Sequence, residues 1–402
     1  MKIALISQEY PPETAHGGIA SQTYSKAKGL AGLGHKVFVI SRSITPERSE
    51  IVQENVTVIR IPGMEAHIPE MTPIVQWITH SVAVAAELES LQQRVELDIV
   101  DFPEWAAEGY TFLLNRTHWK TIPVVIQLHG PLVMLAHTIG WPEMDTVFYN
   151  IGFQMEAACI QLADAVYSSS SCSTEWVRSH YDRPEEDMPV IHLGIDTKTF
   201  FPQPVPKYDQ PIILFVGKIV RNKGVEELIE AIGHLYKDFP GLKLKLFGKV
   251  DAKFGAYLKE KMEKLRISGM VEFAGFIDKE FLPAELSKGH VFAAPSYYEG
   301  GPGFVYLEAM ACGLPVIGCS GSGIDEIIQH ELTGMLVPPK NVNALADALR
   351  RVLEDSKFAK KLGMNARNYI LKECDSDICL TKLEDYYYSV IKKCSIETDS
   401  IQ

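Results

Sequence analysis

The sequence predicts an α/β protein built from two doubly wound, Rossmann-like domains. The chain has 402 residues, which is too long for one hydrophobic core and suits two domains of ordinary size. Short continuous apolar runs alternate with segments of helical periodicity, a pattern typical of parallel strands that helices cover on both faces. Prolines at 202, 204 and 206 interrupt this alternation, which then restarts.

The first half of the chain carries seven apolar runs that predict strands. Two intervening segments, residues 18–33 and 144–162, have the periodicity of amphipathic helices. Repeated strand–helix–strand units imply a doubly wound parallel sheet. The predicted strands are residues 2–7, 36–41, 56–61, 98–102, 123–128, 165–169 and 190–192.

The second half repeats the pattern after the three prolines, which cannot lie in a helix or a central strand and indicate a stiff linker. We therefore predict domains at residues 1–202 and 203–375, followed by an amphipathic tail helix at 376–402. The predicted strands of the second domain are residues 212–216, 243–247, 271–274, 291–294, 315–318 and 334–337.

Composition excludes several classes of function. The net charge of −12 argues against a nucleic-acid partner, because an acidic protein gains no counterion-release energy there, although a local basic patch leaves peripheral membrane contact open. Seven cysteines without a C-x-x-C pair indicate neither a disulfide framework nor a zinc site, and they favour a cytoplasmic location. The longest uncharged stretch, residues 71–86, is too short and too polar to span a bilayer, so we predict no transmembrane segment.

The most informative segment is residues 294–318, which predicts strand, turn, helix, turn and strand. Glu299 ends the first loop, and the glycines up to Gly303 let backbone approach a ligand without side chains in the way. A helix beginning near Phe304 would direct its free N–H groups at a phosphate or an oxyanion. Glu308, one turn inside that helix, could accept hydrogen bonds from sugar hydroxyls. The alternative is an ordinary βα-loop with a surface glutamate.

A second loop, residues 216–224, follows a predicted strand and precedes a helix. It carries two cations, Lys218 and Lys223. A diphosphate leaving group needs such neutralisation when no metal supplies it. Taken alone, the same loop is equally compatible with a solvated connection.

Three further observations concern the first domain and metal binding. Gly17 and Gly18 open a helix after the first strand, but they do not form a G-x-G-x-x-G fingerprint, which disfavours a dinucleotide oxidoreductase. His129 lies at a strand end, where a functional role competes with a structural hydrogen bond. The one D-x-D, Asp375 to Asp377, precedes the tail helix and indicates an N-cap cluster rather than a metal site.

Together these segments resemble the retaining glycosyltransferases of family 4 (glycosyl transferases group 1), which have the GT-B fold. The family's G-G loop, its V-G-R/K-x-x-x-x-K-G motif and its E-G…L-E-A-M-A-x-G-x-P-V segment appear here at residues 17–18, 217–224 and 299–316. Further matches are residues 193–202 and 273–276, so the resemblance covers nearly the whole chain. It implies two Rossmann-like domains facing an interdomain cleft, an N-terminal one on the acceptor side, a C-terminal one for the donor, and a tail helix crossing back to the first.

By this resemblance, donor binding and catalysis fall on particular residues. Lys218 and Lys223 would bind the donor diphosphate, Glu308 the ribose, and the backbone around Phe276 and Ile277 the base. His129 and Glu299 would lie at the transferred sugar as catalytic residues. The donor-binding set is completed by Gly17, Gly18, Gly303, Phe304 and Val305.

Two departures from the family pattern bear on these roles. Eight residues separate Glu299 from Glu308 here, where the family has seven, and we expect the Gly-Gly-Pro-Gly loop to absorb the extra one. Lys218 replaces a frequent arginine and loses its bidentate fork, which loosens phosphate orientation.

The sequence thus predicts a retaining, metal-independent glycosyltransferase that needs no cofactor and moves a sugar from a nucleotide-diphosphate sugar, with UDP expected, to an unidentified hydroxyl acceptor. Two alternatives stay open. A nucleotide-sugar epimerase of the same fold would interconvert sugars without an acceptor, and a non-catalytic nucleotide-sugar-binding protein would follow if Glu299 were displaced.

Overall fold

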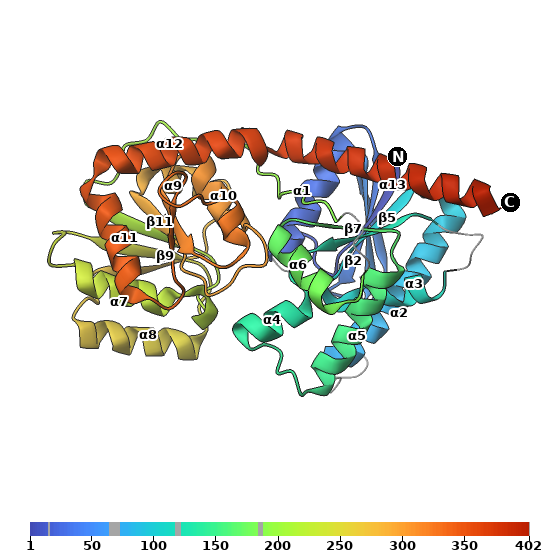
Figure 1. Cartoon of the computed structure of the whole chain (residues 1–402), viewed down its shortest axis with the longest axis horizontal. Coiled ribbons are helices and arrows are strands. Elements are labelled where there is room, and N and C mark those ends of the chain that lie inside the picture. Colours follow the sequence, from blue (N-terminus) through green and yellow to red (C-terminus); the bar gives the residue numbers. More distant parts are fainter. Residues whose placement is uncertain (15–16, 64–72, 117–121, 184–187, 402) are drawn as a thin grey trace. The chain divides into compact units, whose positions relative to one another are not determined.

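The computed structural model describes residues 1–14, 17–63, 73–116, 122–183 and 188–401. Contacts divide the chain into two compact units, residues 1–194 with 377–402 (unit 1) and residues 195–376 (unit 2). Both are α/β units with a central, mostly parallel sheet (Figure 1). Met71 and Thr72 of the uncharged stretch lie outside the described residues.

The change from unit 1 to unit 2 falls at Gly194 and Ile195, whereas the prolines predicted a boundary at 202 and 203. The segment around the first proline is bonded to unit 2. The Phe200 carbonyl accepts a hydrogen bond from Arg367, and the Gln203 amide donates to Ser287 Oγ at 2.9 Å. Polar contacts, which composition does not reveal, therefore attach this segment to the second unit.

Unit 1 has a seven-stranded sheet in the order β3-β4-β2-β1-β5-β6-β7, in which all neighbours are parallel except β3 and β4. Its strands are β1 (Lys2–Ile6), β2 (Lys36–Ser43), β3 (Ser49–Gln53), β4 (Val56–Pro62), β5 (Ile99–Pro103), β6 (Val124–Leu128) and β7 (Ala165–Ser168). Its helices are α1 (Gly18–Gly32), α2 (Pro73–Arg94), η2 (Trp105–Ala107), α3 (Tyr110–Leu114), α4 (Leu132–Ile139), α5 (Val147–Leu162), α6 (Ser171–His180) and α13 (Ser376–Ile401).

Two predictions about these strands were wrong. The sequence analysis did not predict β3, because all five of its residues are exposed and it pairs only at the sheet edge. Residues 190–192 form no strand, and Val190 makes only an isolated bridge to Ser168. Edge pairing depends on a neighbour rather than on an apolar run, so hydrophobic pattern alone misjudges both segments.

Unit 2 has a six-stranded parallel sheet in the order β10-β9-β8-β11-β12-β13. Its strands are β8 (Ile212–Val216), β9 (Lys243–Phe247), β10 (Val271–Gly275), β11 (Val291–Ala293), β12 (Val316–Cys319) and β13 (Met335–Val337). Its helices are η3 (Arg221–Lys223), α7 (Val225–Leu235), α8 (Ala252–Leu265), α9 (Leu282–Lys288), α10 (Phe304–Ala311), η4 (Gly323–Glu326), α11 (Val342–Glu354) and α12 (Ser356–Glu373).

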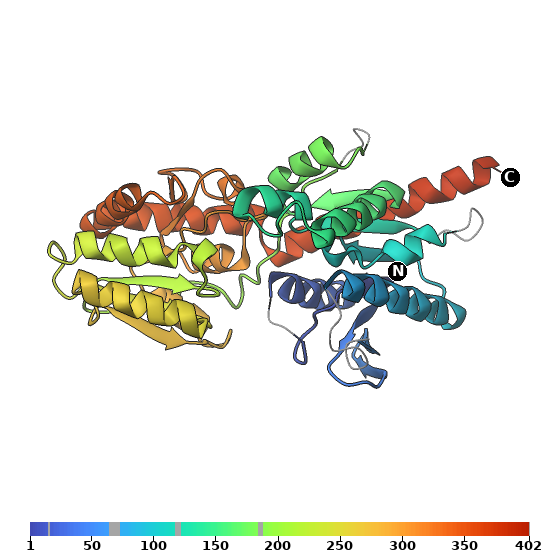
Figure 2. The same cartoon turned by 90° about the horizontal axis from the view of Figure 1, so that it is seen from below.

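Helices cover both faces of the unit 2 sheet. One group contains α7, α8 and α11, and the other contains α9, α10 and α12. The yellow-green α7 and the yellow α8 lie side by side in both views (Figures 1 and 2). Central strands such as β1 and β8 read as continuous apolar runs because both sheet faces are covered.

Two hydrophobic layers flank the sheet of unit 1. One contains residues of α2, α3 and α5, and the other contains residues of α1 together with Leu383, Tyr387 and Val390 of α13. The tail helix therefore completes one face of the unit 1 core. Full burial of a side chain of this size contributes about 1.5–3 kcal/mol.

A buried polar cluster fixes α13 to this face. Lys26 Nζ donates to Asp101 Oδ2 at 2.7 Å and to Gln127 Oε1 at 2.7 Å. The hydroxyls of Tyr167 and Tyr387 both donate to the same Asp101 oxygen. A buried ion pair is costly unless all its hydrogen bonds are satisfied, so this cluster adds little net stability. Its main effect is to favour one position of α13 on the sheet.

Candidate functional site

The site in unit 2 begins at the topological switch point of the sheet. The central strands β8 and β11 are neighbours, and their following segments lead to helices on opposite faces. Doubly wound proteins bind ligands at the carboxyl ends of strands at such a point. The loops after β8 and β11 carry Lys218, Lys223 and Glu299, which the sequence predicted as functional residues.

Lys223 and Glu299 meet across this point. Lys223 Nζ forms an ion pair with Glu299 Oε1, and both side chains are partly exposed. The Glu299 carbonyl also accepts a hydrogen bond of 2.8 Å from the Gly323 amide, which ties the β11 loop to the loop after β12. Lys218, on the same loop as Lys223, is exposed. Two cations and one carboxylate therefore lie on adjoining loops.

The N-terminus of α10 has no side-chain cap. Gly303 is its N-cap, with φ 62° and no side-chain capping hydrogen bond. A positive φ of this size favours glycine, because a Cβ would strain the backbone. Phe304 and Val305, the first two helical residues, are half-buried. Their N–H groups precede the first intrahelical bonds, so this helix end favours a negatively charged group.

Glu308 lies on the same helix and is 3% exposed. Burial raises the pKa of its carboxyl to about 7, and the charge of Lys279 acts in the opposite direction. Lys279 Nζ also lies 5.8 Å from the ring centroid of Phe304. The sequence analysis missed Lys279, because no motif marks it and only the fold brings it to α10.

The residues predicted to frame a base follow β10, two strands from β8. Phe276 is 61% exposed and Ile277 is half-buried. The Gly275 carbonyl accepts a hydrogen bond of 2.8 Å from the Gly248 amide, which follows β9. The loops after β9 and β10 are thus joined on the same edge of the sheet as the two lysines.

In unit 1 the predicted glycines lie at the beginning of α1. Gly17 is its N-cap without a side-chain cap, and a Cβ there would meet the Glu9 carboxylate at 2.8 Å. A Cβ on Gly18 would meet no atom within 4 Å. The helix end is therefore open beside Gly18 and narrow beside Gly17.

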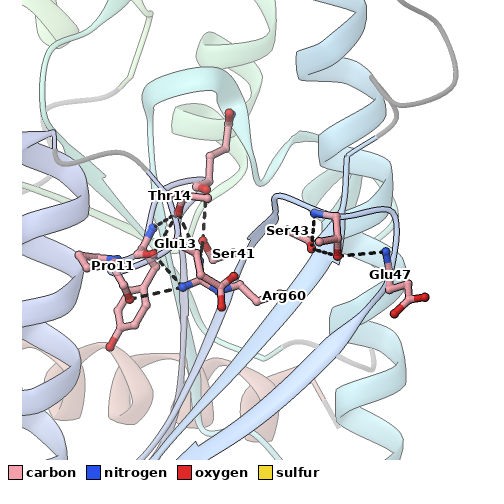
Figure 3. Close-up of polar contacts among 10 residues, drawn as sticks. Pro11, Glu13, Thr14, Ser41, Ser43, Glu47 and Arg60 are labelled. Carbon is pink, nitrogen blue, oxygen red and sulfur yellow. Dashed lines mark hydrogen bonds and ion pairs between the residues drawn. The ribbon is translucent and has the colours of Figure 1, made fainter.

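A buried arginine holds the loop that precedes these glycines. Figure 3 shows Arg60 of β4 reaching Pro11, Thr14 and Ser41. Its Nη2 donates to the Tyr10 carbonyl at 2.8 Å, and its Nε lies 3.3 Å from a carboxylate oxygen of Glu13. Burial lowers the pKa of Arg60. The sequence analysis did not identify this anchor, because its partners are distant in the chain.

His129 directly follows β6 and is half-buried. Burial, with a smaller effect of Lys26, lowers the pKa of its imidazole to about 3. The ring is therefore neutral at physiological pH and offers hydrogen bonds rather than a positive charge. Its backbone amide donates to the carboxylate of Glu104, a residue that the sequence analysis did not identify.

The described residues contain no group of three or more His, Cys, Asp or Glu side chains arranged to hold a metal ion. Asp375 of the D-x-D accepts a hydrogen bond of 2.5 Å from Thr197 Oγ1, and Asp377 lies in the first turn of α13. Among the described residues, no helix is long and apolar enough to cross a membrane.

The fold brings the predicted donor-binding residues of unit 2 to one edge of its sheet. Those after β8, β10 and β11 lie on neighbouring or nearby strands. Gly17, Gly18 and His129 belong to unit 1, at the corresponding edge of the other sheet.

Solved structures with the same fold include sucrose-phosphate synthase from Thermosynechococcus elongatus. It has a TM-score of 0.84 and 24% identity, over 98% of this chain and 99% of that one. Anabaena HepE in complex with UDP-glucose has a TM-score of 0.75 and 20% identity, over 97% of this chain and 100% of that one.

Sequence comparison identifies the family. An uncharacterized glycosyltransferase of Methanocaldococcus jannaschii is 29% identical over 393 residues, 94% of this chain and 95% of that protein. The model for Glycosyltransferase Family 4 matches residues 16–199, and the model for Glycosyl transferases group 1 matches residues 196–369. The chain is therefore a glycosyltransferase that belongs to family 4 and has the GT-B fold.

Proposed function

We propose that this glycosyltransferase moves a sugar from a UDP-sugar to a hydroxyl acceptor, with retention of anomeric configuration and without a metal ion. The observation that carries the proposal is the edge of unit 2. There an ion-paired lysine, an uncapped helix N-terminus and a buried carboxyl lie on loops and a helix around one switch point. These are the groups that a diphosphate linked to a ribose requires.

The diphosphate is the group that these contacts suit best. Lys218 and Lys223 supply positive charge, and the free amides of Gly303, Phe304 and Val305 supply aligned donors. Donors fixed before the reaction stabilise charge as it develops on a leaving group. Breaking the sugar–phosphate bond leaves its electron pair on the diphosphate, so both sets of contacts strengthen as the bond breaks.

Glu308 suits the ribose of the nucleotide. A carboxyl with a pKa of about 7 accepts hydrogen bonds when ionised and both donates and accepts when neutral. The exposed Phe276 and its neighbour Ile277 offer an apolar surface for the base. HepE, which shares the fold, was solved with UDP-glucose, and this supports UDP as the nucleotide.

The sugar end of the reaction falls to His129 and Glu299. The neutral imidazole of His129 would donate a hydrogen bond to a sugar hydroxyl without competing for a proton. In a front-face transfer, the acceptor oxygen bonds to the anomeric carbon on the side that the diphosphate leaves. The acceptor's proton passes to the departing phosphate oxygen, so no protein side chain needs to form a bond to the sugar.

A thermal-shift screen with UDP-, GDP- and ADP-sugars, without added metal, tests the donor. We expect UDP-sugars to raise the melting temperature most, since ligands that bind only the folded state stabilise it. Proton NMR of the transferred sugar then tests retention. A larger rise in melting temperature with GDP- or ADP-sugars would show that the donor nucleotide is not UDP. A product of inverted anomeric configuration would refute the front-face route.

We expect transfer to survive chelation. Because lysines and helix amides face the proposed diphosphate site, activity in excess EDTA should equal that in its absence, measured as UDP release with the acceptor that the screen identifies. Loss of activity in EDTA that manganese or magnesium restores would show that a divalent ion completes the site.

A further inference from the structure

The loop that carries His129 is held from beneath by two buried carboxyls. Glu104 Oε1 accepts hydrogen bonds from the amides of His129 at 2.7 Å and Gly130 at 2.5 Å. Glu156 Oε2 accepts one from Leu132 at 2.8 Å. Pro131 has no N–H, so every amide donor from 129 to 132 is bonded to a carboxylate oxygen. Neither glutamate side chain is exposed.

Glu104 is itself fixed to the neighbouring strand. It follows β5, and its amide donates to the carbonyl of Gln127 on β6 at 3.0 Å. Its carbonyl accepts from Ala107 at 3.0 Å in the η2 turn. The backbone of Glu104 is thus attached to β6, and its side chain is attached to the loop that follows this strand and begins at His129. Such a double attachment leaves the loop little freedom.

We propose that Glu104 is a positioning residue, whose carboxylate fixes the backbone at His129 and Gly130 and so directs the imidazole of His129 toward the transferred sugar. The inference rests on the proposed role of His129. Burying a carboxyl is costly unless it is hydrogen-bonded, and here the bonds go to the amides of His129 and Gly130, which would lose their acceptor if an apolar side chain replaced Glu104. Two short hydrogen bonds to consecutive amides provide orientation.

The second carboxyl oxygens of Glu104 and Glu156 bear on the protonation state of these side chains. Glu104 Oε2 and Glu156 Oε1 are buried and lack a hydrogen-bond partner among the described residues. Burial raises the pKa of Glu104 to about 7, while the amides of Gly130 and His129 act against it. Burial, and then the charge of Glu104, raises the pKa of Glu156 well above its usual value. The groups that interact with this pair include those loop amides, the Tyr181 hydroxyl, which donates to Glu156 at 2.8 Å, and the side chains of Tyr149 and Cys159 on α5.

The direction of the pH effect follows. The pKa of Glu104 is higher in the folded protein than the ordinary value near 4.3, so folding favours its protonated form. The neutral carboxyl is the less costly one to bury, and its carbonyl oxygen still accepts from both amides. The contribution of Glu104 to stability is therefore fully present below the ordinary pKa near 4.3 and is lost as pH rises toward about 7. A pH-dependent step should accompany this ionisation.

Variants of Glu104 test the inference. In Glu104→Ala we expect kcat to fall about 10²-fold, the effect of a misplacement near 1 Å, while KM for the donor changes much less because most of the proposed donor contacts lie in unit 2. Glu104→Gln keeps an oxygen for both amides and cannot ionise. It should retain kcat near the wild-type value and lose any inflection of the kcat–pH profile near neutrality.

The matched control is Glu87→Gln. Glu87 is also a buried glutamate of unit 1, but it pairs with Arg48 and accepts no hydrogen bond from a backbone amide of the described residues. This variant should keep the wild-type kcat and pH profile. A loss of kcat in Glu87→Gln equal to the loss in Glu104→Ala would show an effect of general stability and would overturn the inference.

Amide hydrogen exchange separates this inference from the proposed function. Exchange at His129 and Gly130 should quicken in Glu104→Ala, whatever the reaction. Unchanged exchange would overturn the inference, as would unchanged kcat in Glu104→Ala when His129→Ala lowers kcat. Normal kcat in His129→Ala would instead refute the role of His129. If Glu104→Ala does not fold, the pH profile and the exchange rates of Glu104→Gln decide.

Discussion

Lys223→Ala is expected to lower kcat/KM by about 10²- to 10³-fold, the usual effect of losing one preorganised contact to developing charge. Lys223 lies at the switch point of the unit 2 sheet and is ion-paired with Glu299. Its removal takes a cation from the proposed diphosphate site and leaves a carboxylate there unpaired. Both changes act against a negatively charged leaving group, and steady-state kinetics with calorimetric titration of UDP would measure the loss.

Two controls sharpen this prediction. Lys243→Ala removes an exposed lysine at the beginning of β9, on the opposite edge of the same sheet, and should leave kcat/KM unchanged. A double-mutant cycle with Glu299→Ala separates pairing from catalysis, because a lysine that only neutralises Glu299 would cost nothing once Glu299 is gone. Wild-type UDP affinity and turnover in Lys223→Ala would contradict the proposed site.

Gly248→Ala is expected to reduce the free energy of unfolding of unit 2 by at least about 2 kcal/mol. Gly248 has φ 145°, and a Cβ there would lie far inside van der Waals contact with the carbonyl of Gly217. Its amide donates to the carbonyl of Gly275, and the Gly217 amide donates to Phe247 at 2.9 Å. An added methyl group must therefore separate the loops after β8, β9 and β10.

The same substitution should raise KM for the donor, since Lys218 adjoins Gly217 and Phe276 adjoins Gly275. Urea unfolding followed by a probe in unit 2, together with donor KM, would measure both effects. Gly269→Ala is the matched control, because a Cβ there meets no atom within 4 Å and no positive φ is required. Similar stability of the two variants would show that the loops separate at little cost.

The sequence predicted the sheets well where strands are buried on both faces. Covered parallel strands read as apolar runs, so β8, β9 and β11 were found close to their observed bounds. The exposed β3 has no such run. The apolar run at 190–192 forms only an isolated bridge, between Val190 and Ser168, and no strand. The hydrophobic pattern of a segment indicates whether it is buried. Whether it pairs at the edge of a sheet depends also on the strand beside it.

The unit 2 site was predictable because its residues are concentrated in short segments after strands. Glu104, Arg60 and Lys279 were not, because each acts through contacts made by the fold. Glu104 meets His129 across 25 residues of chain, and Arg60 meets Tyr10 across 50. No local pattern distinguishes a buried carboxyl or guanidinium that holds a loop from a solvated one before the strands have been paired.

The docking of α13 on unit 1 has a consequence for the order of synthesis. Unit 1 is assembled from residues 1–194 and 377–402, with all of unit 2 encoded between them. A ribosome therefore synthesises all of unit 2 before it adds Tyr387, whose hydroxyl donates to Asp101. Until then one apolar face of the nascent first unit is covered only in part, by α1, and the ion pair between Lys26 and Asp101 lacks its hydrogen bond from Tyr387. Unit 1 is thus the first unit to be synthesised and the last to be completed. Its partly exposed apolar face makes the incomplete chain prone to aggregation during that interval.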